Sequence, residues 1–77
     1  MATGFVLITT EPGREHDVRS SLDAIEHVTS RWMLFGEYDL IAKVEADEEY
    51  TLTRVIVEDI RPISGITDTK TLLGAEI

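Results

Sequence analysis

The sequence predicts a single α+β domain in which strands and helices follow the order βαββαβ. Four runs of apolar and β-branched residues have the length of strands. Two stretches with helical periodicity separate them, one after the first run and one before the last. The chain has 77 residues, the length of one domain. We therefore expect residues 1–77 to form one domain.

The first half begins with a strand at residues 4–10 and continues with a helix at residues 14–25. The strand has apolar residues on both of its alternating faces, and such a strand is covered on both faces. A Glu-Pro-Gly tripeptide ends it, and proline is tolerated in the first turn of a helix. Three apolar residues then recur at helical spacing: Val18, Leu22 and Ile25.

Two strands at residues 28–35 and 38–46 are predicted to form a hairpin around Gly36. Glycine takes positive φ at little steric cost and leaves the neighbouring backbone N–H groups approachable. Most of the aromatic residues lie in this hairpin, and its turn carries two carboxylates, Glu37 and Asp39. If the chain binds a small molecule, we expect that molecule near this turn.

The second helix is expected from an N-cap at Asp47 to about Arg61, because Pro62 cannot continue it. A last strand, rich in β-branched residues, follows at residues 66–73. The complete order is that of the ferredoxin-like split βαβ unit. It predicts an antiparallel four-stranded sheet with both helices on one face.

The other face of this sheet has no cover within a single chain. The first strand is nevertheless apolar on both faces, and Trp32 or Met33 must also face outward. An uncovered apolar face marks an association surface. A domain of this size has a marginal core, and without cysteine it has no disulfide to support the fold. We therefore predict a homodimer packed sheet on sheet.

The composition excludes several classes of function. Seven Lys and Arg residues stand against fifteen Asp and Glu residues, so the formal net charge is −8. The arginines are scattered, and the clustered basic side chains that hold a nucleic-acid backbone are missing. The two histidines, His16 and His27, show no converging partners for a metal site, and no cofactor motif is visible. No apolar run has the length of a membrane span and no signal peptide is seen, which favours a cytoplasmic protein.

Two segments resemble motifs of the Lrp/AsnC transcription regulators. Residues 35–44 resemble the G-x-[YF]-D hairpin of that family, and residues 61–71 resemble its I/L-x-x-[IL]-x-G-V-x-x-T-x-T segment. The resemblance covers residues 5–73 and is to the C-terminal effector-binding domain, also called the RAM domain. Full-length members carry a helix-turn-helix domain before it, so the chain resembles the stand-alone form, without direct DNA binding.

The resemblance implies a function and a site. In the family this domain dimerises through its sheets, dimers assemble into rings that are commonly octamers, and amino acids bind between dimers near the hairpin turn. It implies a domain that senses amino acids or related small metabolites. Such a domain modulates transcription regulation by assembly with itself or with full-length regulators. The effector-binding positions that the resemblance implies are Gly36, Tyr38, Asp39, Arg61, Thr69 and Thr71.

The residue types at these positions suit an amino acid. Asp39 can accept hydrogen bonds from the ammonium group, while Arg61 or the backbone N–H groups around Gly36 can donate to the carboxylate. Each residue also has a structural alternative: Asp39 as a turn acceptor or a member of a surface ion pair, Arg61 as a helix C-terminal cation, and Gly36 as a turn glycine.

Two other functions stay open. One is a small dimeric ferredoxin-like enzyme of the monooxygenase type, since one fold hosts many functions, but no base or nucleophile constellation is evident. The other is a purely structural oligomerisation domain that binds nothing.

Overall fold

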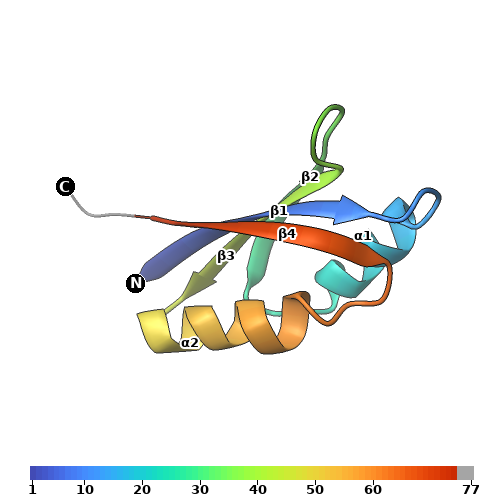
Figure 1. Ribbon diagram of the computed structural model, residues 1–77. Coiled ribbons are helices and arrows are strands. Elements are labelled where there is room, and N and C mark those ends of the chain that lie inside the picture. The colour runs from blue at the N-terminus through green and yellow to red at the C-terminus, as the bar shows by residue number, and fades with distance from the viewer. Residues whose placement is uncertain (75–77) are drawn as a thin grey trace.

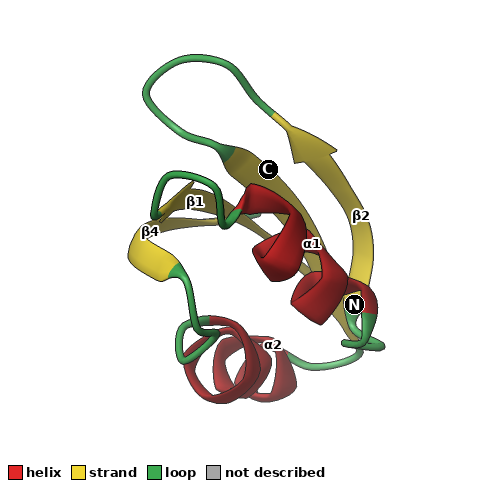
Figure 2. Cartoon of the chain, turned by 90° about the vertical axis from the view of Figure 1, so that its right-hand side faces the viewer, coloured by secondary structure: helices red, strands yellow, loops and turns green. Residues whose placement is uncertain are grey.

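The computed structural model describes residues 1–74 and confirms the predicted fold class. The elements follow in this order: β1 (Ala2–Thr10), α1 (Glu15–Asp23), β2 (Val28–Met33), β3 (Leu40–Ala46), α2 (Glu49–Val55), the π-helix η1 (Ile56–Ile60) and β4 (Ile66–Leu73). The strands form one antiparallel sheet in the order β2-β3-β1-β4. Both helices cover the same face of this sheet (Figure 1, Figure 2). The last three residues of the predicted domain, 75–77, lie outside the described part.

The core lies between the sheet and the helices. Alternate residues of β1 and β3 point toward the helices and are buried, among them Val6, Ile8 and Leu40. The helical segments supply the other wall of the core: Val18, Leu22, Leu52, Val55, Ile56 and Ile60. Full burial of a leucine or isoleucine side chain contributes about 1.5–3 kcal/mol. This layer is therefore the main source of stability within one chain.

The opposite face of the sheet, here called the outer face, carries a second set of apolar side chains. The strand registers place five of them there: Phe5, Leu7, Trp32, Ile41 and Leu72. The first two and Ile41 are partly buried by their neighbours, whereas Trp32 and Leu72 are about half exposed. Both lysines of the chain, Lys43 and Lys70, also lie on this face. The outer face is thus apolar at its centre, and its charged residues are these two lysines together with Glu45 and Asp68.

The connection between β2 and β3 is a wide loop at residues 34–39, not the predicted short turn. Each strand is shorter at this end than predicted. The N–H of Leu34 donates to the carbonyl oxygen of Asp39 over 2.9 Å and closes the hairpin before Phe35 is reached. Phe35 consequently projects from the loop with its side chain fully exposed.

The helices lie close to the predicted limits, with one correction. α1 is slightly shorter than 14–25, and α2 with η1 ends directly before Arg61, as expected. The predicted N-cap of α2, Asp47, is wrong. The N-cap is Glu48, whose φ of −127° and ψ of 150° are extended, and its side chain makes no capping hydrogen bond. Extended φ and ψ angles are typical of an N-cap residue, so the helix begins at Glu49, one position later than predicted.

A β-bulge between Val28 and Ser30 decides which side chains of β2 face the helices. After the bulge, Arg31 points toward the helices and Trp32 toward the outer face, as their partners on β3 show. Arg31 forms an ion pair with Asp23 at the end of α1. It therefore ties β2 to α1.

Candidate functional site

The six predicted effector-binding residues fall into two groups in the fold. Gly36, Tyr38 and Asp39 lie in the loop between β2 and β3. The others lie directly after η1 and on β4: Arg61, Thr69 and Thr71. β1 runs between the two groups (Figure 1), and the hollow lined by Asp39 shares no residue with the two hollows lined by Arg61. One chain therefore does not join these residues into one pocket.

Asp39 fixes the loop to the end of β1. Its Oδ2 accepts hydrogen bonds from the N–H of Thr10 over 2.8 Å and from Thr10 Oγ1 over 3.4 Å. The backbone N–H of Asp39 donates to the carbonyl oxygen of Ile8 over 2.9 Å. One carboxylate oxygen thus accepts hydrogen bonds from the end of β1, and the other makes no hydrogen bond to residues 1–74.

Asp39 also lines a hollow of about 290 Å³, here called the Asp39 hollow. The other lining residues are Glu15, His16, Met33, Leu34 and Phe35. Glu15 Oε1 is buried, and neither carboxylate has an ion-pair partner within the described chain. An ammonium group has three N–H donors and no acceptor. The Asp39 hollow therefore suits the amine end of a small molecule that also has an apolar part.

Sequence reasoning missed Glu15. It belongs to the first turn of α1, where a glutamate also suits the helix dipole. Its distance from Asp39 along the chain gives no signal of contact. Only the packing of α1 beside the loop brings both carboxylates to one hollow.

Gly36 and Tyr38 contribute to the shape of the loop. Gly36 has a φ of 135°, and an added Cβ would meet nothing within 4 Å. The backbone conformation, not the lack of space, therefore requires glycine at this position. Tyr38 is partly buried and is not one of the residues that line the Asp39 hollow. The effector role of both residues stays a prediction.

Arg61 follows η1 and lines two hollows beside the edge strand β4. Its backbone N–H donates to the carbonyl oxygen of Ile56 over 3.0 Å, which is the hydrogen bond of a π turn. One hollow, of about 170 Å³, includes Thr69, and the other, of about 190 Å³, includes Thr71. The side chain is exposed and has no ion pair with another residue of 1–74. The fold thus brings the three residues of this group together.

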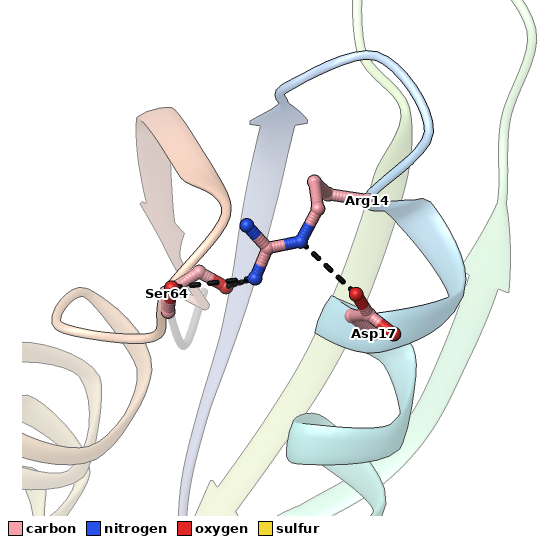
Figure 3. Close-up of polar contacts among 3 residues, drawn as sticks. All are labelled: Arg14, Asp17 and Ser64. Carbon is pink, nitrogen blue, oxygen red and sulfur yellow. Dashed lines mark hydrogen bonds and ion pairs between the residues drawn. The ribbon is translucent and has the colours of Figure 1, made fainter.

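Arg14 holds the start of α1 against the turn before β4 (Figure 3). Its Nη2 donates to Ser64 Oγ over 3.3 Å and to the Ser64 carbonyl oxygen over 3.5 Å, and its Nε pairs with Asp17 Oδ2 at 3.0 Å. The N–H of Glu11 donates to the carbonyl oxygen of Gly65 over 2.9 Å. These contacts fix α1, beside the first group, relative to β4, which carries part of the second.

Within residues 1–74, no three His, Cys, Asp or Glu side chains are grouped so that they could hold a metal ion. His16 lies at the Asp39 hollow and His27 lines a separate hollow with Glu26 and Glu45. No helix in this part of the chain is long and apolar enough to cross a membrane.

The sequence and the fold match a known class of regulatory domain. The family model of the Lrp/AsnC ligand binding domain covers residues 3–74. The chain belongs to the Lrp/AsnC family of transcription regulators, of which it forms the ligand-binding domain. The resemblance carried by the two sequence motifs is thereby confirmed.

The curated relatives are longer than this chain. Uncharacterised HTH-type transcriptional regulators of Pyrococcus horikoshii and Pyrococcus abyssi are each 28% identical over 75 residues, which is 94% of this chain and 50% of theirs. The chain therefore spans about half the length of the curated relatives that it matches.

Solved structures give the same fold. The crystal structure of FFRP-DM1 has a TM-score of 0.92 at 39% identity and covers 97% of this chain and 100% of its own. The hypothetical protein PHS023 from Pyrococcus horikoshii has a TM-score of 0.91 at 38% identity, and the match covers 100% of this chain and 93% of that protein. A transcriptional regulator from Neisseria meningitidis, solved as a complex with L-Met, has a TM-score of 0.85 at 14% identity over 97% of this chain and 50% of its own. At that identity the likeness shows the fold alone.

Proposed function

We propose that the chain is an effector-binding domain for amino acids or related small metabolites, which bind between dimers of an oligomer. Binding changes the assembly of the domain with itself or with full-length Lrp/AsnC regulators, and so modulates transcription. The observation that supports this proposal is that Asp39 lines a hollow with a second carboxylate, Arg61 lines a hollow without acidic residues, and β1 lies between them. The complete oligomer is proposed to be an octamer in the cytoplasm, and its role is regulatory, not catalytic.

The two hollows suit the two ends of an amino acid. Asp39 and Glu15 can accept hydrogen bonds from the ammonium group, and Arg61 can donate to the carboxylate. Because one chain keeps these groups apart, one ligand contacts both only where two copies meet. A ligand that binds the assembled state better than the separate parts stabilises the assembly by linkage. The Neisseria meningitidis regulator, whose structure contains L-Met, is consistent with a ligand of this class.

The outer face supports dimer formation. Its five apolar side chains form one surface across all strands, and two of them are about half exposed in a single chain. Stacked sheets pack about 10 Å apart with interdigitated side chains. We propose that two copies pack here sheet on sheet, which leaves the hollows accessible for contacts between dimers.

Salt is expected to strengthen this association. Each copy carries a formal net charge of −8, so two copies repel each other, while the contact itself is mainly apolar. Screening shortens the reach of this repulsion from about 30 Å at 0.01 M salt to about 3 Å at 1 M. Sedimentation velocity over this range should show a rising fraction of dimers and larger species. Weaker association at high salt would mean that attraction between charges holds the copies together.

One observation favours a second candidate, a purely structural oligomerisation domain. Asp39 Oδ2 is already occupied by hydrogen bonds from Thr10, as it would be in a residue that only shapes a loop. A structural domain would keep its assembly state and melting temperature in the presence of every amino acid. A screen of all twenty amino acids by thermal shift and sedimentation velocity separates the two candidates.

Replacement of Asp39 by asparagine is expected to weaken binding of the effector at least tenfold while the dimer stays folded. Asparagine keeps an oxygen for the Thr10 N–H, so the loop keeps its hydrogen bond, but the charge that attracts an ammonium group is lost. Isothermal titration calorimetry with each amino acid found in the screen measures the change.

The matched control is Glu37→Gln, which removes one charge from the same exposed loop but does not alter a residue of the Asp39 hollow. It should bind as the parent protein does. Equal affinity of Asp39→Asn and the parent for every effector would show that Asp39 does not belong to the site.

A further inference from the structure

The second hollow beside Arg61, here called the Arg61 hollow, has a composition that differs from the rest of the surface. It lies between α2, η1 and β4 and has a volume of about 190 Å³. Its lining residues are Thr53, Ile56, Val57, Arg61, Thr71 and Leu73. One cation and two hydroxyl groups thus face three apolar side chains, and no acidic residue lines the hollow, although the chain has fifteen.

The π turn of η1 creates this arrangement. In an α-helix the backbone N–H of Arg61 would donate to the carbonyl oxygen of Val57, four positions earlier. Here it donates to the carbonyl oxygen of Ile56, five positions earlier, which is the hydrogen bond of a π turn. Both Ile56 and Val57 consequently line the same hollow as Arg61. Short π segments inside helices are rare and occur frequently at functional sites.

Gly4 of β1 leaves room under the hollow. A Cβ at this position would lie 3.5 Å from Leu73 Cδ2 and 3.6 Å from Ile56 Cδ1, so both apolar side chains rest over the bare backbone of β1. The floor of the hollow is therefore apolar, while Arg61 stands at its exposed rim.

This geometry defines the chemistry that the hollow can bind. A guanidinium group binds a carboxylate through two parallel hydrogen bonds, and threonine hydroxyl groups can add further ones. The apolar wall takes a short aliphatic chain, and an engineered cavity of about 150 Å³ holds a molecule as large as benzene. An ammonium group finds no carboxylate in this hollow.

We propose that the Arg61 hollow of a single chain recognises an aliphatic carboxylate by its carboxylate and its side chain, and does not require an α-ammonium group. A 2-oxo acid therefore binds this hollow as well as the amino acid of the same carbon skeleton. The inference rests on the proposed function in one respect: only the amino acid has the ammonium group that contacts the Asp39 hollow of another copy. The amino acid joins copies, and the 2-oxo acid occupies the site without joining them.

The test compares leucine, valine and methionine with the three 2-oxo acids of the same skeletons. Calorimetric titration of Asp39→Asn, in which the Asp39 hollow no longer attracts the ammonium group, should give affinities within about threefold for at least one pair. Arg61→Gln should weaken binding of both members of that pair at least tenfold, because the charged donor is lost. Arg54→Gln removes an exposed arginine of α2 that does not line the hollow, and it should bind as the parent does. Circular dichroism checks that both variants stay folded.

Three results would overturn the inference: binding of the amino acids but not of the 2-oxo acids, binding by Arg61→Gln equal to the parent, or no binding of any of the six compounds. Sedimentation velocity separates this failure from failure of the proposed function. If both members of a pair bind through Arg61 and neither changes the assembly, the inference stands and the proposed function fails. If amino acids change the assembly of Arg61→Gln as they do for the parent, the proposed function stands and the inference fails.

Discussion

Replacement of Leu7 by aspartate is expected to convert the protein to a monomer. Leu7 lies on the outer face of β1, one of the two central strands, between Ile41 of β3 and Lys70 of β4. In a dimer packed sheet on sheet, this position is the centre of the contact. Burial of a carboxylate there costs several kcal/mol of lost hydration, which attraction to the neighbouring Lys70 offsets only in part. About 3 kcal/mol corresponds to more than a hundredfold increase in the dissociation constant, which sedimentation velocity at a series of protein concentrations measures.

The control for this variant is Tyr50→Asp, which adds the same charge at an exposed residue of α2. It should leave the association unchanged apart from the small repulsion of one further charge. Trp32→Asp provides a second disrupting variant at an edge strand, where a single chain tolerates the change because the side chain is already half exposed. A parent-like dimer in both Leu7→Asp and Trp32→Asp would show that the copies associate through another surface.

Replacement of Gly65 by alanine is expected to give the largest loss of stability among the glycine positions. Gly65 has a φ of 101°, and an added Cβ would lie 3.2 Å from both Arg14 Cβ and Val18 Cγ2. The strained backbone costs about 1–3 kcal/mol, and forcing an extra carbon between packed atoms costs a further 1–3 kcal/mol or so. The sum is a large part of the roughly 5–15 kcal/mol by which a domain is stable.

Urea unfolding of Gly65→Ala and the parent at one protein concentration measures this loss. Gly13→Ala is the matched control, because Gly13 has a φ of 84° but no atom within 4 Å of an added Cβ. Gly13→Ala introduces the backbone strain without the crowding. The difference in the free energy of unfolding between the two variants therefore measures the cost of crowding against α1. Equal destabilisation by the two variants would show that the turn before β4 can move away from α1 at no cost.

The strands and the core were predictable because apolar residues recur at the short, regular spacing of a strand or a helix, and this spacing is visible in the sequence. The limits 66–73 for β4 are confirmed residue by residue, and the buried faces of β1 and α1 follow from alternating and helical spacing. The π turn had no such signal, since Ile56 and Arg61 fit an ordinary helix end equally well in the sequence.

The loop and the site were predictable only in part. The length of the loop depends on hydrogen bonds of Leu34 and Asp39, of which one joins the loop to β1. Arg61, Thr69 and Thr71 were named as effector-binding positions only through the resemblance to a family, and the fold places Arg61 at one hollow with Thr69 and at another with Thr71. Glu15 and Val57 were missed because a lining residue is defined by which elements pack side by side, and spacing along one element carries no such information.

The position of Trp32 makes the association visible without a label. It is the only tryptophan of the chain, and it lies about half exposed on the outer face. Indole fluorescence shifts to shorter wavelength when the ring leaves water, so the emission of the native protein reports on this one surface. A shift that follows protein concentration would trace dimer formation, whereas a ligand at the Arg61 hollow, on β4 at the opposite edge of the sheet from β2, would leave the emission unchanged unless it also altered the assembly. The same signal would therefore distinguish binding from assembly in a single titration.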